Sequence, residues 1–196
     1  MLVAGWALWS RSAQTPANPP VTSVEIGFPR DVAPYSFLAR PAISPDGRTV
    51  AMVGVRDGGR RVFVRRLDRA EADELPDTLG ATGAVFSPNG ASVAVVFTSG
   101  LITRISLVDQ QRSAVASGVD TASSVTWNEA GIVFGRGLAL WVVSPEGGEP
   151  RSLTVLDAAR HEVAHEYPVV LPGGRLVLFT NQTTEPDKGA HRSNVD

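Results

Sequence analysis

The sequence predicts an all-β protein, and three observations carry this prediction. Short apolar runs rich in valine and isoleucine follow turn-type tetrapeptides. No segment between these runs shows the helical periodicity of 3.6 residues, which argues against an α/β fold. Glycine and proline number 19 and 14 among the 196 residues, a content that indicates many tight turns.

Four turn tetrapeptides recur at a nearly constant spacing. They read SPDG, SPNG, NEAG and LPGG, and their last glycines, Gly47, Gly90, Gly131 and Gly174, stand 43, 41 and 43 residues apart. Proline presets φ for the first turn position, Asp or Asn bonds back to the chain, and glycine adopts positive φ without a clash. Each tetrapeptide therefore predicts a hairpin turn that leads into a strand.

Each turn is followed by an apolar run that is short, β-branched and apolar on both faces. Such runs are typical of strands buried between two neighbouring sheets. The four runs are residues 49–53, 92–97, 132–134 and 176–180. A second strand is expected about ten residues later in the first three units, at residues 62–67, 101–107 and 138–143. Polar turns containing Asp68, Asp109 or Glu146 come next, and then third strand-like pieces, such as 113–116 and 151–155.

The length of the repeat identifies the architecture. Four short antiparallel strands with their turns occupy about 40 to 45 residues, the length of one blade of a β-propeller. Residues 41–196 hold between three and four such units, whereas propellers close with about four to eight blades. We therefore expect a partial β-propeller of about three to four four-stranded antiparallel blades, an incomplete ring over residues 21–180. Uncovered blade faces would favour self-association.

At these repeats the sequence resembles the WD40-like (PD40) repeat of TolB-type β-propellers, over about residues 21–180. Residues 41–47 (PAISPDG), 138–154 and 153–180 are also similar to the extracytoplasmic propellers that follow a kinase domain and one transmembrane helix in bacterial serine/threonine protein kinases. Asn89 departs from the repeat where an aspartate is usual, and the third turn is degenerate at residues 128–131. The resemblance implies a membrane-anchored bacterial protein with a periplasmic propeller, which acts as a sensor or protein-interaction module for a protein or peptide partner.

The two ends of the chain differ from the repeats. Residues 2–9 are an uninterrupted apolar run of eight residues, too short for a membrane span of about 20 residues. Trp6 and Trp9 suit the interface of a membrane, so we favour the outer end of a membrane helix. A signal-like segment and a disordered start are the alternatives. We assign residues 1–12 to this segment, 13–20 to a Pro-rich linker and 181–196 to a polar tail.

Composition and motifs exclude several functions. The net charge is −2 without a block of like charge, so the chain lacks the electrostatic footprint of a nucleic-acid-binding protein. It has no cysteine and therefore no disulfide or thiolate site. Kinase motifs and the Gly-x-Ser-x-Gly elbow of hydrolases are absent from the sequence. We predict that the chain is not an enzyme and that it is a fragment of the C-terminal extracytoplasmic region of a bacterial serine/threonine protein kinase. The alternatives are the propeller of a prolyl-oligopeptidase-type serine peptidase and a free TolB-like periplasmic protein.

One motif suggests metal chemistry. His161, Glu162 and His165 match H-E-x-x-H, which on a helix places two zinc ligands and a general base on one face. The possible helix, residues 156–166, is cut short by the strand expected around Pro168, and Glu185, spaced as a third ligand, lies in the turn-rich tail. We interpret the motif as a structural or solvent-exposed loop between the third and fourth units, with a zinc protease and adventitious metal binding as alternatives.

The remaining patterns have structural interpretations. Residues 135–137 (GRG) read as a tight turn rather than a dinucleotide fingerprint. Trp127 and Trp141 are expected to pack between blades rather than to stack on a ligand. Turn capping explains Asp46, Asp68 and Asp109 better than calcium binding does. We accordingly expect no catalytic, cofactor-binding or metal-binding residues, and no cofactor.

Overall fold

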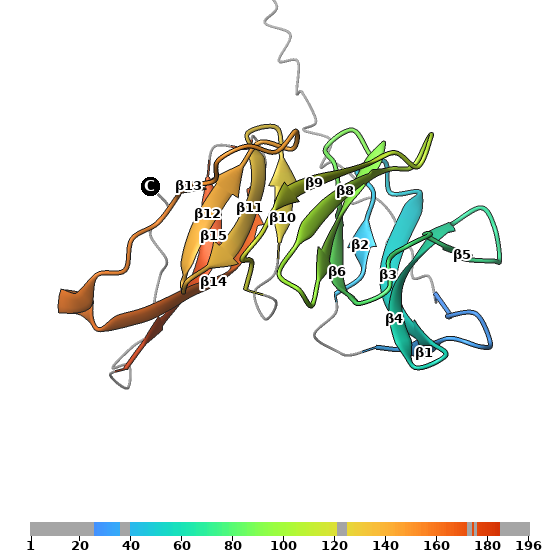
Figure 1. Ribbon diagram of the computed structural model, residues 1–196, viewed down its shortest axis with the longest axis horizontal. Coiled ribbons are helices and arrows are strands. Elements are labelled where there is room, and N and C mark those ends of the chain that lie inside the picture. The colour runs from blue at the N-terminus through green and yellow to red at the C-terminus, as the bar shows by residue number, and fades with distance from the viewer. Residues whose placement is uncertain (1–25, 36–39, 121–124, 172–173, 175, 185–196) are drawn as a thin grey trace, which may run out of the picture.

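The computed structural model describes residues 26–35, 40–120, 125–171, 174 and 176–184. These residues form four antiparallel sheets that lie side by side as the blades of an arc, with the first blade at the right of Figure 1 and the fourth, in orange and red, at the left. The helical content of the described residues is a single 3-10 turn, η1 (Ala158–Arg160). The predicted all-β partial propeller of three to four blades is thus confirmed.

The first blade contains five strands. They are β1 (Ala33–Pro34), β2 (Ala42–Ile43), β3 (Thr49–Arg56), β4 (Gly59–Arg66) and β5 (Asp73–Glu74). Strand β3 pairs with β1 and β2 on one side and with β4 on the other, and β5 is the outer strand. Asp57 and Gly58 join β3 to β4 with φ values of 51° and 71°, the backbone that a two-residue hairpin turn requires.

The second and third blades are four-stranded meanders in chain order. The second contains β6 (Ala81–Phe86), β7 (Ser92–Phe97), β8 (Ile102–Ser106) and β9 (Arg112–Ala116). The third contains β10 (Thr126–Asn128), β11 (Gly131–Arg136), β12 (Ala139–Val143) and β13 (Arg151–Ser152). Strand β6 contacts β2 of the first blade and β10 of the third, so these strands of neighbouring blades lie next to one another.

The fourth blade differs from the sequence expectation. It consists of β14 (Glu162–Val170) and β15 (Val177–Thr183). The expected loop at residues 161–165 is wrong, because β14 begins at Glu162. Strand β15 also continues three residues past the expected boundary at Thr180. The register of β14 shifts between Glu166 and Val169, so a bulge accommodates Pro168, which cannot donate to a ladder.

The core lies between the blades, because each central strand buries both of its faces. In β7, Val93 and Val95 pack in the cluster shared with the first blade, whereas Ala94 and Val96 pack in the cluster shared with the third. Alternating side chains therefore enter different cores, which explains why the sequence runs are apolar on both faces. Trp127 and Trp141 pack, partly buried, against the cluster between the second and third blades, as expected.

The repeated turns have the expected hydrogen-bond chemistry. The Ser44 hydroxyl donates to Asp46 Oδ1 at 2.5 Å and accepts the Thr49 N–H at 2.9 Å. In the second blade, Ser87 donates to Asn89 Oδ1 at 2.7 Å, and the following strand donates to Ser87 in the same way. Asparagine therefore replaces aspartate without loss of an acceptor.

The N-terminal assignments fall outside the described residues. Both the apolar segment at residues 1–12 and the linker at 13–20 belong to the undescribed part of the chain. In the part that the structure describes, no helix has the length and apolar character needed to cross a membrane.

Candidate functional site

The H-E-x-x-H motif adopts a geometry different from that of a zinc helix. His161 is the C-cap of η1 with φ of 56°, and Glu162 and His165 lie on strand β14. Residues three apart on a regular strand face opposite sides. A register shift between Glu162 and Ala164 instead brings Glu162 Oε2 to 3.2 Å from His165 Nε2.

These two residues belong to a polar network, here called the His165 cluster: Thr154, Asp157, Glu162, His165 and Asn181. The side chains of Glu162 and His165 are only 7% and 4% exposed. His165 Nδ1 lies 2.9 Å from Thr154 Oγ1. Glu162 accepts the Asp157 N–H at 2.8 Å and the Asn181 side-chain amide at 2.6 Å. The Asp157 N–H, followed by the Asn181 amide and the His165 ring, holds the pKa of Glu162 below its ordinary value against the opposing effect of burial.

The carboxylate determines the tautomer of the histidine. Because an ionised Glu162 only accepts hydrogen bonds, Nε2 of His165 donates to it, and in the tautomer protonated at Nε2 alone the Nδ1 atom accepts from the Thr154 hydroxyl. The resulting order of hydroxyl, imidazole and carboxylate is also used in nucleophilic catalysis. Here, however, Thr154 Oγ1 already accepts the Leu140 N–H at 3.0 Å, and the His165 ring contacts Phe179 at 4.7 Å between centroids.

A comparison between blades assigns the cluster a structural role. In the first blade, Thr78 Oγ1 accepts the Val62 N–H at 3.0 Å and donates to the Leu75 carbonyl at 2.7 Å. Thr154 repeats the first of these bonds in the third blade but has His165 as its second partner. The His165 cluster therefore joins the third blade to β14 of the fourth. No group of three or more His, Asp or Glu that could hold a metal occurs among the described residues.

The other residues that the sequence singles out have local roles. Asp68 accepts a bidentate ion pair from Arg66, and Asp109 accepts the Gln111 N–H at 3.2 Å. Hydrogen bonds, from Arg66 and Ser106 respectively in the first place, lower the pKa of these two carboxyls. Residues 135–137 lead into a two-residue turn between β11 and β12, since Gly137 and Leu138 both have positive φ.

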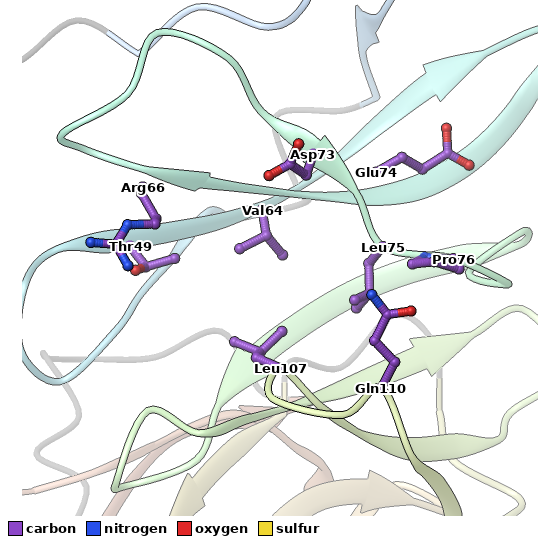
Figure 2. Close-up of a pocket in the computed structure, with 9 residues that line it drawn as sticks. All are labelled: Thr49, Val64, Arg66, Asp73, Glu74, Leu75, Pro76, Leu107 and Gln110. Atoms are coloured by element: carbon purple, nitrogen blue, oxygen red, sulfur yellow. The ribbon is translucent and has the colours of Figure 1, made fainter.

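A hollow of about 290 Å³, here called the seam pocket, opens between the first two blades (Figure 2). It is lined by Thr49, Val64, Arg66, Asp73, Glu74, Leu75, Pro76, Leu107 and Gln110. The first seven belong to the first blade and the loop that leaves it, and the last two to the turn between β8 and β9. Sequence reasoning missed this pocket, because its lining comes from segments that no motif connects.

The seam pocket combines apolar walls with one uncompensated charge. Arg66 is neutralised by its ion pair with Asp68. Glu74 pairs with Arg56 at 2.6 Å and with Arg61 at 3.1 Å. Asp73 is exposed, and its carboxylate has no hydrogen-bond or ion-pair partner among the described residues.

Contacts between the blades hold the pocket open. Arg112 of β9 reaches back to the first blade, where it donates to the Pro76 and Asp77 carbonyls and pairs with the Asp77 carboxylate at 3.1 Å. Leu75, one of the lining residues, is 5% exposed and packs in the core shared by the two blades. The pocket is thus a preformed feature of the seam.

The arrangement of the blades is similar to that of known propellers. The putative TolB of Agrobacterium tumefaciens gives a TM-score of 0.57 at 18% identity, over 74% of this chain and 54% of that chain. TolB from Acinetobacter baumannii gives 0.51 at 16% identity, over 70% and 36%. An oligogalacturonate lyase from Vibrio parahaemolyticus gives 0.54 at 15% identity, over 78% and 47%. The chain therefore has a β-propeller fold of the TolB type.

At the level of sequence, no protein-family model matches the chain. One curated relative is an uncharacterized peptidase, YuxL, of Bacillus subtilis strain 168, which is 27% identical over 158 residues. The match covers 79% of this chain but only 23% of that peptidase. The chain thus spans less than a quarter of this relative and about a third to a half of the TolB structures.

Proposed function

We propose that the chain is a non-catalytic β-propeller module that binds a protein or peptide partner. The preformed seam pocket, with its apolar walls and the unpaired carboxylate of Asp73, carries this proposal. The H-E-x-x-H motif supports it, since the side chains of Glu162 and His165 are buried and bonded to each other, and His165 also contacts Thr154 of the third blade. A propeller scaffold suits such a role, although the fold by itself does not select a ligand.

A peptidase-linked propeller is the second candidate. The 27% identity to the Bacillus subtilis peptidase over 158 residues favours the propeller of a serine peptidase over the kinase-linked propeller that the sequence resembles. In that arrangement the propeller would screen substrates and a hydrolase domain would carry the chemistry. The kinase-linked arrangement, the membrane anchor and the periplasmic location stay predictions.

Two reagents distinguish these roles. The complete product of the gene is treated with a fluorophosphonate probe, which labels activated serines, and separately with radiolabelled ATP. Fluorophosphonate labelling supports the peptidase-linked role, and autophosphorylation supports the kinase-linked role. Neither signal is expected of a free TolB-like protein. The 196-residue chain alone is the control, and labelling or peptide hydrolysis by that chain would contradict its non-catalytic assignment.

A further inference from the structure

We propose that the seam pocket binds a single basic side chain, arginine or lysine, presented by an extended segment of a partner protein. This inference rests on the binding role proposed above and names the chemistry of the partner. Its support is the size of the pocket, the character of its walls, its local charge and its rigidity.

The size of the pocket sets the scale of the ligand. Pockets for cofactors and drug-sized molecules occupy about 300–1,000 Å³, and the seam pocket, at about 290 Å³, is just smaller than that range. It lies beside the two-residue strand β5, the outer strand of the first blade. Such a volume suits one long side chain better than a cofactor.

The walls match the aliphatic part of a basic side chain. Val64, Leu75 and Leu107 provide an apolar surface. In Figure 2, Asp73 lies on one side of Val64 and Leu75, and Gln110 lies on the other side. Arginine and lysine bury their methylene stems along apolar surfaces and keep the charged end at a polar edge. The pocket has a polar group at each end of this apolar surface, Asp73 at one and Gln110 at the other.

The charge balance selects a cation. Arg66 and Glu74 already have opposite charges beside them, so their contributions largely cancel. Asp73 remains as an uncompensated carboxylate, and the side-chain carbonyl of Gln110 is a second acceptor. A guanidinium or ammonium group gains a partner here, whereas a carboxylate would be repelled by Asp73.

The pocket is rigid enough to act as a preformed site. Gln110 adopts φ of 58° in a turn closed by the bond from the Gln111 N–H to Asp109. Two residues later, Arg112 fastens this turn to the first blade. Preorganised walls reduce the ordering cost of binding, so even a short peptide is expected to be detected.

Three capped tripeptides test the inference: acetyl-Gly-Arg-Gly-amide, acetyl-Gly-norleucine-Gly-amide and acetyl-Gly-Glu-Gly-amide. Each is titrated into the ¹⁵N-labelled 196-residue chain while amide chemical shifts are followed. The arginine peptide is expected to shift amides at residues 73–77 and 107–111 at the lowest concentration, the norleucine peptide at a higher one and the glutamate peptide at the highest. Equal responses to arginine and glutamate would overturn the inference.

Matched variants locate the site. Asp73→Asn is expected to weaken binding of the arginine peptide about threefold, the effect of one exposed ion pair, and to leave norleucine binding unchanged. Glu71→Gln removes the same charge from an exposed position two residues before Asp73 and outside the pocket, and should change neither. Val64→Phe fills the pocket and should abolish both responses, with circular dichroism as the check on folding. Equal effects of Asp73→Asn and Glu71→Gln would show that the peptide responds to the overall surface charge and would overturn the assignment to Asp73.

The outcomes separate this inference from the proposed function. Arginine-peptide shifts confined to another surface would overturn the pocket assignment and leave the binding role intact. Absence of any localised shift would overturn the pocket assignment as well. The non-catalytic role fails independently, through labelling or hydrolysis by the isolated chain.

Discussion

His165 Nδ1 in the fourth blade lies 2.9 Å from Thr154 Oγ1, which follows the last strand of the third. The same threonine accepts the Leu140 N–H of β12, so one hydroxyl connects a central strand of one blade to the first strand of the next. In the first blade, Thr78 is bonded within its own blade instead. The seam between the third and fourth blades is therefore specified by a polar contact in addition to apolar packing.

Replacement of His165 should weaken this seam. His165→Ala leaves Thr154 and Glu162 with fewer partners and removes the ring that packs against Phe179. We expect a loss of about 2–3 kcal/mol in the free energy of unfolding, measured by urea denaturation. His161→Asn is the matched control, because His161 is exposed and asparagine tolerates its left-handed backbone. It should cost less than His165→Ala, because the His161 side chain is exposed whereas that of His165 is buried. Equal losses would contradict a special role for His165.

Glu162 predicts a loss of stability in acid. Its carboxyl has a pKa below the ordinary 4.5, so the unfolded chain binds a proton more readily than the folded one. The stabilisation is fully present above pH 4.5 and is lost as the pH falls through the lower folded value. Thermal unfolding from pH 7 to pH 3 should therefore show a steeper decline for the wild type than for Glu162→Gln. Parallel curves for the two proteins would contradict this.

The contacts of Arg112 are expected to stabilise the seam between the first and second blades. Arg112→Ala removes an exposed ion pair with Asp77 and two hydrogen bonds to backbone carbonyls. Solvent screens the pair, so the expected cost is about 1 kcal/mol. It is measured as a fall in melting temperature together with faster amide exchange at residues 74–78. Arg69→Ala is the control, since its exposed side chain makes no contact across the seam. An equal fall in melting temperature for Arg69→Ala would show that the loss of one positive charge explains the effect, and would contradict a stabilising role of the Arg112 contacts.

The serines that begin the first two repeated turns, Ser44 and Ser87, are expected to contribute equally to the free energy of unfolding. Ser44→Ala and Ser87→Ala each remove a hydroxyl that both donates to a turn side chain and accepts a strand N–H. We expect each to cost about 1 kcal/mol in urea denaturation. Because Pro45 of the first turn lies beside Gly90 of the second, the double variant measures how strongly the two turns are coupled. Markedly unequal single effects would show that the Asp46 and Asn89 turns differ in more than charge.

The sequence predicts the blades well but the seams poorly, for a physical reason. The turn at Ser44 and the strand after it are encoded within ten residues, so spacing and turn chemistry are sufficient to place them. The sequence places the start of the strand in the fourth blade around Pro168, whereas β14 already begins at Glu162 and a bulge accommodates the proline inside it. The seam pocket depends on contacts such as that of Arg112 with Pro76. No local pattern encodes contacts between residues so far apart in the chain.

The lateral face of the fourth blade predicts self-association of the 196-residue chain. Val169, Leu176 and Leu178 are 46%, 42% and 43% exposed, and Val169 is the register partner of Leu178, so apolar side chains gather on one sheet. Burial of such a face against a second copy is favourable. Sedimentation and light scattering should therefore reveal concentration-dependent oligomers. Leu178→Lys should shift them toward monomer, while Val155→Lys, at an 82% exposed loop position, should not. A chain that stays monomeric at every concentration, or equal effects of the two lysines, would contradict association through this face.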